Sequence, residues 1–358
     1  MKSLLSASKT KAVIGLLIGI GLLFLVSRFV NISASLQVLQ EHLATPRGIM
    51  LALLSGVAFI LAFSIRGIRW KLFLHPVVGN KVSAFKAIQL YLISIFLNFL
   101  LPIQGGEMAK CLMIKRITGI PISRSLPTVA MDRSLDLMPA LFIITIVPIL
   151  GVHMDFKLWL VLGIVVGLLV CLISFIGLAT WKRASAIAFL QTITNMLPKA
   201  IGDKIEGFAT GFVDSLLLGA SRPRIFLPAI LLTCLALTFD GVFAMLAFWA
   251  IGYYIPLGTA IFGYTLYNMF NILPTPPGQV GSNEAIGLLV FGGLLHLKSS
   301  NVLAMFVFSH PWAALIMTTC GMTCLSALGL TIAKIMKAPP EENDKEDLLL
   351  SEKEEVPA

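Results

Sequence analysis

Long apolar runs, separated by short polar stretches, dominate the pattern of this 358-residue chain. A helix needs roughly 20 apolar residues to cross the hydrocarbon core of a bilayer, and these runs are near or above that length. We therefore predict an all-α, polytopic membrane bundle of about six to eight transmembrane helices. The long runs cover residues 12–30, 48–65, 126–151, 158–181, 225–252 and 302–335.

Two further apolar runs, 87–101 and 258–273, are shorter, and each ends in a segment rich in proline and glycine. Such breaks free backbone groups, which within a bilayer must be satisfied by protein or by a water-filled cavity. Paired breaks in the two halves of a membrane chain indicate a substrate site between repeats. We predict two re-entrant hairpins in a pseudo-inverted arrangement, broken at Pro102, Gly105, Gly106, Pro274, Pro276, Pro277, Gly278 and Gly281.

The distribution of positive charge predicts the orientation, because lysine and arginine are concentrated in cytoplasmic segments. We interpret residues 66–86 as a basic cytoplasmic loop that follows the second span. In that loop, Arg66 and Arg69 either set the topology and anchor lipid headgroups or form a docking site for a lipid phosphate. The predicted location is a bacterial-type inner membrane, with both termini in the cytoplasm.

Three further segments complete the predicted organisation. Residues 182–224 carry apolar side chains at helical spacing between charges, which predicts a cytoplasmic amphipathic loop within one integral membrane domain, residues 1–337. The acidic residues 338–358 predict a disordered cytoplasmic tail. In the last apolar run, we expect Ser309-His310-Pro311 to divide a short helix from a span.

Composition argues against several function classes. Only 13% of the residues are charged, which is about half the fraction usual in soluble domains. The net charge of +9 follows from the positive-inside bias, so we expect no nucleic-acid partner. The cysteines form no Cys-x-x-Cys pair, and enzyme and nucleotide motifs are missing, so we expect no metal and no cofactor. The scattered histidines are interpreted as interfacial rather than catalytic.

Five acidic residues fall in or beside apolar runs, where a carboxylate costs a few kcal/mol and therefore indicates function. Asp132 and Asp136 share one helix face, and Arg133 can reach Asp136. This group is either a buried ion pair that neutralises itself or a binding site in which the acids hold Arg133 in place. In the second case, the guanidinium group of Arg133 binds two oxygens of a phosphate or carboxylate. Asp240 is a lone acid within a span, and its expected partner is Asn268 or Asn271.

Glu107 and Glu284 each stand where a helix is predicted to restart. Their role is either capping of the helix N-terminus or binding of a proton, a coupling ion or a polar substrate head. Gln104 and Gln279 lie in the same broken segments and can supply neutral hydrogen bonds. The predicted substrate site comprises Arg66, Arg69, Gln104, Glu107, Asp132, Arg133, Asp136, Gln279 and Glu284.

Four short motifs in a fixed order carry a resemblance to a known family. Over roughly residues 10–335, the chain resembles the lysylphosphatidylglycerol synthase transmembrane-region family, also described as flippase-like. It departs from the family pattern at Asp132, where glutamate is expected, and at the additional Pro277. The motifs are Arg66-Gly-Ile-Arg69-Trp70, Asn98 to Pro102 with Gly106-Glu107, Asp132-Arg133 with Asp136, and Leu273-Pro274-Thr275-Pro276-Pro277-Gly278 up to Glu284.

The resemblance implies a role in moving lipids. In bifunctional members, this membrane unit resembles a flippase that moves an aminoacylated lipid between leaflets, and a separate cytosolic domain makes that lipid. We expect a stand-alone member without the synthase domain. Its implied substrate is a phospholipid or another lipid with a polar headgroup, and a lipid-synthesising enzyme is a candidate partner.

We therefore predict a lipid translocator rather than an enzyme, with Arg66, Arg69 and Lys110 attracting an anionic phosphate from the cytoplasm. Two alternatives stay open. The first is an intramembrane transferase acting on a polyprenyl phosphate or phospholipid, with Asp132 or Asp136 as base or metal ligand. The second is a non-transporting partner subunit of a lipid-modifying complex.

Overall fold

A computed structural model describes residues 32–100, 105–136, 223–270 and 277–332, together with a few isolated positions. The predicted first span, residues 182–222 of the predicted loop and the acidic tail lie outside these residues, as do most of 137–181. The described part is helical, with elements α2 (Ile32–His42), α3 (Pro46–Val78), η1 (Gly79–Lys81), α4 (Ala84–Leu100), α5 (Gly105–Thr118), α6 (Ile122–Asp136), α11 (Pro223–Ala250), α12 (Leu257–Phe270), η3 (Pro277–Gln279), α13 (Ser282–Gly287), the π-helical η4 (Leu288–Leu294) and α14 (Ser299–Ala327).

Three helices of the described part, α3, α11 and α14, are long and apolar enough to cross a bilayer. They coincide with the runs predicted at 48–65, 225–252 and 302–335. The all-helical class is therefore confirmed for these residues. The total of six to eight crossings includes runs outside them and stays a prediction.

Helix α3 is 33 residues long and extends well past the predicted end of the second span. It begins at a Thr45 cap, whose hydroxyl accepts a hydrogen bond from the Gly48 N–H at 3.0 Å, with Pro46 in the first turn. The prediction of a basic loop from residue 66 is wrong, because Arg66 and Arg69 lie inside this helix. Acidic side chains on other helices neutralise both arginines, so the chain stays helical and packed.

Helix α14 is continuous from Ser299 to Ala327, although Pro311 lies near its middle. The predicted division at Ser309-His310-Pro311 is therefore wrong. Proline removes one backbone hydrogen bond, but side chains of the same turn fix the helix to its neighbours. Trp312 donates its indole N–H to the carbonyl of Ala52 in α3 at 3.0 Å, and His310 bonds to η3 and α13.

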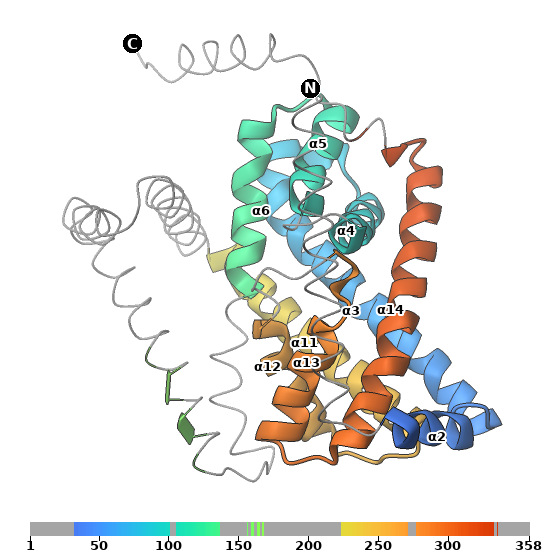
Figure 1. Cartoon of the computed structure of the whole chain (residues 1–358). Helices are drawn as coiled ribbons and strands as arrows, with labels where there is room; N and C mark the ends of the chain where they lie inside the picture. The colour runs from blue at the N-terminus through green and yellow to red at the C-terminus, as the bar shows by residue number, and fades with distance from the viewer. Residues whose placement is uncertain are drawn as a thin grey trace, which may run out of the picture.

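Two apolar cores occupy opposite ends of the helical body. The α5 core is built from α3, α4 and α5 and includes Trp70 and Leu325, whereas the α12 core is built from α11, α12, η4 and the first half of α14 and includes Phe306. Figure 1 shows α4, α5 and α6 gathered around the upper end of α3, whereas α11, α12 and α13 lie in the lower half of the helical body. Helix α14 runs from the α12 core to the α5 core (Figure 1).

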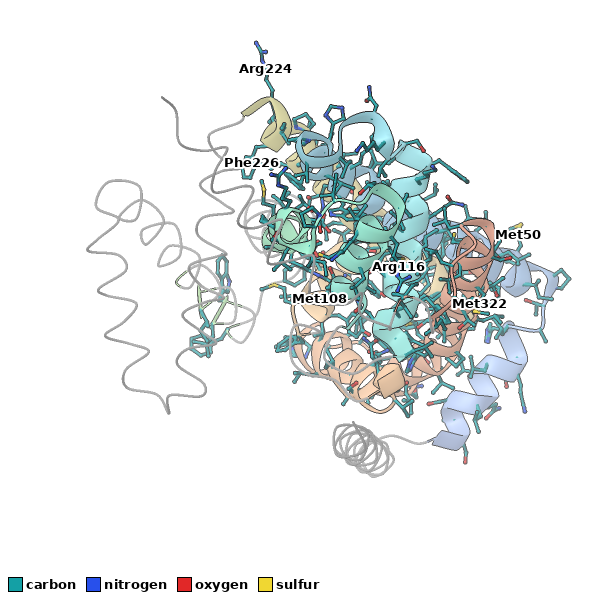
Figure 2. All side chains as sticks on the ribbon, turned by 90° about the horizontal axis from the view of Figure 1, so that it is seen from above. Met50, Met108, Arg116, Arg224, Phe226 and Met322 are labelled. Carbon is teal, nitrogen blue, oxygen red and sulfur yellow. The ribbon has the colours of Figure 1, made fainter. Side chains whose placement is uncertain are left out.

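The outer surface of α3 and α14 carries exposed apolar side chains. Met50 of α3 and Met322 of α14 lie at the periphery in Figure 2, and both are more than half exposed. Arg224, at the start of α11, points away from the helical body (Figure 2). Exposed apolar side chains on helices of this length fit contact with lipid tails.

The residues of the two predicted breaks are described only in part. Helix α4 is described up to Leu100 and α5 from Gly105, and α12 is described up to Phe270 and η3 from Pro277. Gly278 and Gly281 have φ angles of 69° and 78°, which glycine adopts without strain. The re-entrant course and the pseudo-inverted relation of the two hairpins stay predictions. Four of the predicted break or site residues, Pro102, Gln104, Pro274 and Pro276, lie outside the described part of the chain.

Helices α4 and α5 pack closely because Gly106 has no side chain. A Cβ atom at this position would lie 2.0 Å from the carbonyl oxygen of Ser94, a distance that atoms do not reach. The Gly106 N–H donates to the Asn98 side-chain oxygen at 2.8 Å, and the Ser94 hydroxyl donates to the Gly106 carbonyl at 2.9 Å. These contacts satisfy backbone groups at the start of α5 and place Glu107 against α4.

Candidate functional site

Arg69 of α3 is fully buried and joins α3 to α6 and α11. Its Nε donates to Asp132 Oδ1 at 2.8 Å, and Nη2 donates to Asp136 Oδ1 at 2.8 Å and to the Asp132 carbonyl at 3.1 Å. Its Nη1 donates to the hydroxyl of Thr233 in α11 at 3.1 Å. The planar guanidinium group thus uses its rigid set of donors to grip both acids of α6.

Lys110 of α5 is also fully buried. Its ammonium nitrogen lies 3.0 Å from Glu107 Oε2 and 3.5 Å from Asp132 Oδ2, so it is paired with two carboxylates. The same nitrogen lies 3.9 Å from the centre of the Tyr91 ring and 5.4 Å from that of Trp70, which adds cation–π attraction.

Glu107, in the first turn of α5, connects three helices. Its Oε1 accepts hydrogen bonds from the Asn98 amide of α4 at 2.9 Å and from Nη2 of Arg133 in α6. The Ser94 hydroxyl lies 3.5 Å from the same oxygen. A carboxylate in the first turn also meets the positive end of the helix dipole, so capping and pairing act together.

Arg133 forms the exposed edge of this arrangement. Its side chain is 37% exposed, and Nη1 donates to Asp136 Oδ2 at 3.2 Å. Asp136 is 28% exposed and Glu107 15%, whereas Arg69, Lys110 and Asp132 are almost fully covered. The Nε donor of Arg133 is buried and has no acceptor among the residues that the structure describes.

We call the six ionisable residues linked by these contacts the charge network. It contains three cations and three carboxylates, so its formal charge is zero. A buried ion in a low-dielectric interior is tolerated when it is paired and hydrogen-bonded, and removal of one partner leaves an uncompensated charge. Ionisable groups within membrane helices are costly and mark functional sites by default. Its members are Arg69, Glu107, Lys110, Asp132, Arg133 and Asp136.

A second ion pair joins α3 to α11. Both terminal nitrogens of Arg66 donate to the carboxylate of Asp240, at 2.5 and 3.2 Å. The amide of Asn268 in α12 donates to the same carboxylate at 3.2 Å, which confirms Asn268 as a partner of Asp240. Sequence reasoning did not pair Asp240 with Arg66. A single base in one apolar segment and a single acid in another indicate such a pair, because each needs a partner of opposite charge.

Glu284 lies apart from the charge network and contacts the second broken segment. Its Oε2 accepts a hydrogen bond from the Gly281 N–H at 2.8 Å, which is a capping contact at the start of α13. The alternative role in binding stays a prediction. Its Oε1 lies 2.8 Å from Nδ1 of His310, and Nε2 of His310 lies 2.8 Å from the Gly278 carbonyl oxygen. Interpretation of His310 as interfacial is wrong, because its side chain is only 10% exposed and lies in this packed contact.

The structure brings together five of the predicted site residues, Arg69, Glu107, Asp132, Arg133 and Asp136, and adds Lys110 to them. Arg66, Arg69 and Lys110 are paired with acids in the interior, so they do not form the predicted cytoplasmic attraction site for phosphate. Gln279 has a φ of 55°, and its carbonyl accepts a hydrogen bond from Ser282 at 2.8 Å.

Similarity to known proteins agrees with the motifs. Residues 12–321 match the lysylphosphatidylglycerol synthase TM region family. The chain is 22% identical to glycosyltransferase AglD of Haloferax volcanii over 375 residues, which cover 95% of this chain but only 58% of the relative. It is 24% identical to a UPF0104 membrane protein of Methanothermobacter thermautotrophicus over 248 residues, covering 63% of this chain and 70% of the relative. No solved structure matches.

The family match covers far more than half of the sequence and includes α2 to α13 and most of α14, with both broken segments and the charge network. The expected family is thereby confirmed. This chain is a multi-pass membrane protein and belongs to the lysylphosphatidylglycerol synthase transmembrane-region family.

Proposed function

We propose that this protein moves a lipid with a phosphate-containing polar headgroup between the two leaflets of a membrane. The observation that carries the proposal is the charge network, in which the buried Arg69, Lys110 and Asp132 are all in ion pairs. Its exposed edge consists of Arg133, Asp136 and Glu107. A headgroup that enters a bilayer loses its hydration, and a protein lowers that cost with groups that replace the lost interactions.

Arg133 is the group best suited to receive the headgroup. Arginine presents several donors in one plane and binds phosphate oxygens in pairs, and Arg133 has the buried, unused Nε donor described above. A phosphate that binds Arg133 displaces Glu107 or Asp136 from it. Lys110 retains Glu107 and Arg69 retains Asp136, so neither acid is left unpaired.

The acyl chains remain in the lipid phase in this proposal. Leu53, Leu54 and Val57 of α3 are about half exposed and offer an apolar surface next to the helical body. Only the headgroup therefore needs polar contacts on its passage. We include in the same proposal that two opposed hairpins open the charge network alternately to the two sides of the membrane. The paired breaks support this part.

Leaflet exchange of headgroup-labelled lipids in proteoliposomes tests the proposal. We expect exchange by the native protein and a decrease of at least about tenfold for Arg133→Gln, equivalent to ~1.4 kcal/mol in the barrier. Glu107→Gln removes the negative charge but keeps an acceptor for Asn98. We expect the rate of lipid exchange to decrease in this variant too. Anionic, zwitterionic and cationic headgroups are compared to identify the preferred substrate.

Glu41→Gln provides the matched control for Glu107→Gln, because it is the same chemical change on the exposed face of α2. It should exchange lipids at the native rate. Equal exchange by native protein and both network variants, with all of them folded, contradicts a role of the network in translocation. No exchange of any lipid by folded native protein contradicts the function itself.

A second candidate function is transfer of a sugar or headgroup onto a lipid phosphate within the membrane. It is favoured by the similarity to a relative named glycosyltransferase AglD, over nearly all of this chain. In that case Asp132 or Asp136 would serve as the base, although both are bound to Arg69 here. Product formation from a nucleotide sugar or lipid-linked sugar by purified protein distinguishes the two functions.

A further inference from the structure

His310 is held between two oxygen atoms on separate elements. Its Nδ1 lies 2.8 Å from Glu284 Oε1 in α13, and its Nε2 lies 2.8 Å from the Gly278 carbonyl oxygen in η3. The other carboxylate oxygen of Glu284 already accepts the Gly281 N–H at 2.8 Å. Both side chains are at least nine-tenths buried, so water does not readily replace these contacts.

The proton count of this arrangement is unusual. A neutral imidazole has one N–H donor, but the carbonyl oxygen and an ionised carboxylate are both acceptors. Both contacts are favourable only if one additional proton lies between Nδ1 and Oε1. That proton is on the ring, giving an imidazolium–carboxylate pair, or on Oε1, giving a neutral pair in which the acid donates to Nδ1.

We propose that His310 and Glu284 form a binding site for one exchangeable proton, and that its occupancy couples translocation to pH. Loss of the proton places a lone pair of Nδ1 against Oε1, or a lone pair of Nε2 against the Gly278 carbonyl. Either way, one of the two 2.8 Å contacts becomes repulsive. Protonation therefore fastens α14 to the second broken segment, and deprotonation releases it.

Among the described residues, Glu284 is the charged group that contacts His310. Helix α4 contributes the uncharged Phe99 ring, 6.3 Å from the imidazole centre. On neighbouring helices, Tyr91 of α4 contacts Lys110, Asp240 of α11 is paired with Arg66, and Tyr267 of α12 donates to the Asn283 side chain. On α4, Lys86 lies more than three turns before Phe99. On α14 itself, the cysteines Cys320 and Cys324 lie ten or more residues beyond His310.

The site is connected to the charge network through the last turn of α4. Asn98 binds Glu107, and the next residue, Phe99, contacts both His310 and the neighbourhood of Gly278, where a Cβ would lie 3.8 Å from the ring. Release of the second broken segment changes the packing of Phe99. Such a change alters the position of Asn98 and thus the contacts of Glu107, which is how the proton influences the network.

Two spectroscopic measurements detect the proton directly on the full chain in nanodiscs. Nitrogen NMR of protein with ¹⁵N-labelled histidine rings reports which ring nitrogens carry hydrogen, and His310→Gln identifies the His310 signal. Infrared difference spectra report a protonated carboxyl, and Glu284→Gln identifies the band. We expect either an imidazolium at His310 or a carboxylic acid at Glu284. A neutral ring together with an ionised Glu284 at every pH at which the protein is folded overturns the proposal.

The coupling to translocation rests on the proposed function and is measured separately. Native protein should exchange lipids at a rate that changes at least about threefold with the pH of the proteoliposome lumen, and His310→Gln should abolish that response. His75→Gln, at an exposed position of α3, is the control and should respond like native protein. An identical pH response of the native and His310→Gln proteins overturns the coupling. A detected proton without any lipid exchange contradicts the proposed function and leaves the proton site intact.

Discussion

The ring of Phe99 meets the imidazole of His310 edge-on, with 6.3 Å between the ring centres and an angle of 87° between the planes. This contact joins the end of α4 to the second broken segment, because Phe99 follows the asparagine that binds Glu107 and His310 is bound to Glu284. The two glutamates at the helix breaks thus belong to separate sites that share one turn of α4. The Phe99–His310 contact is therefore a physical route by which the Glu107 site and the Glu284 site can influence each other.

Arg69→Met is expected to destabilise the protein strongly. The change leaves Asp132 buried without its main partner, and breaking a buried pair from one side costs about 3–5 kcal/mol. The melting temperature in detergent micelles should fall by several degrees. Arg224→Met, the same change at an exposed position, should leave the melting temperature unchanged.

The double variant Arg69→Met/Asp132→Asn checks the reason for that loss. Because it removes both charges, it should be more stable than Arg69→Met alone. A melting temperature of the double variant equal to or below that of Arg69→Met would indicate that lost packing of the arginine, rather than the unpaired carboxylate, causes the instability.

Gly106→Ala should separate α4 from α5. The added Cβ would meet the Ser94 carbonyl at 2.0 Å and the Asn98 oxygen at 2.8 Å, so one helix must shift. Overpacking of this kind costs roughly 1–3 kcal/mol, and it also breaks the bond from Asn98 to Glu107. Gly293→Ala, where the nearest atom would lie at 3.8 Å, is the control for thermal unfolding and lipid exchange. Native behaviour of Gly106→Ala would show that the two helices are not packed at this glycine.

Sequence reasoning identified the helical class, the family and the glycines of the second break because these depend on local features. Runs of apolar residues set the helices, and glycine marks the second break, where Gly278 and Gly281 have positive φ angles. The pairing of Arg133 with Asp136 follows from their spacing on one helix. Each of these inferences needs only residues that are near one another in the chain.

The errors concern residues whose partners are far away in the sequence. Arg66 and Arg69 were assigned to a loop because charged residues usually end a span, whereas Asp240 and Asp132 on other helices allow α3 to continue. The interpretation of His310 as interfacial is a similar error, because its partner Glu284 lies on a different helix. Composition alone does not reveal that a buried charge is neutralised by a distant helix.

Arg66→Lys is expected to weaken the α3–α11 contact without unfolding the protein. Lysine keeps the positive charge but cannot donate two parallel hydrogen bonds to Asp240, as Arg66 does at 2.5 and 3.2 Å. A loss of about 1.5–3 kcal/mol fits one hydrogen bond to a charged group. Thermal unfolding measures the effect, with Arg224→Lys as the matched control. Equal losses in both variants would mean that the Arg66–Asp240 geometry contributes nothing to stability.

The Phe99–His310 contact predicts that variants at the two sites are not additive. Asn98→Ala removes the neutral partner of Glu107, and His310→Gln removes the ring against which Phe99 packs. Residues in contact or linked through a shared neighbour show interaction energies of about 0.5–3 kcal/mol in double-mutant cycles, whereas distant residues add. The cycle of Asn98→Ala and His310→Gln should therefore give a measurable interaction energy in unfolding. The same cycle with Phe99→Ala in every member should give none, because the connecting ring is gone, and pairing Asn98→Ala with Glu41→Gln of α2 should be additive throughout. An interaction energy that survives Phe99→Ala would mean that the two sites communicate by another route.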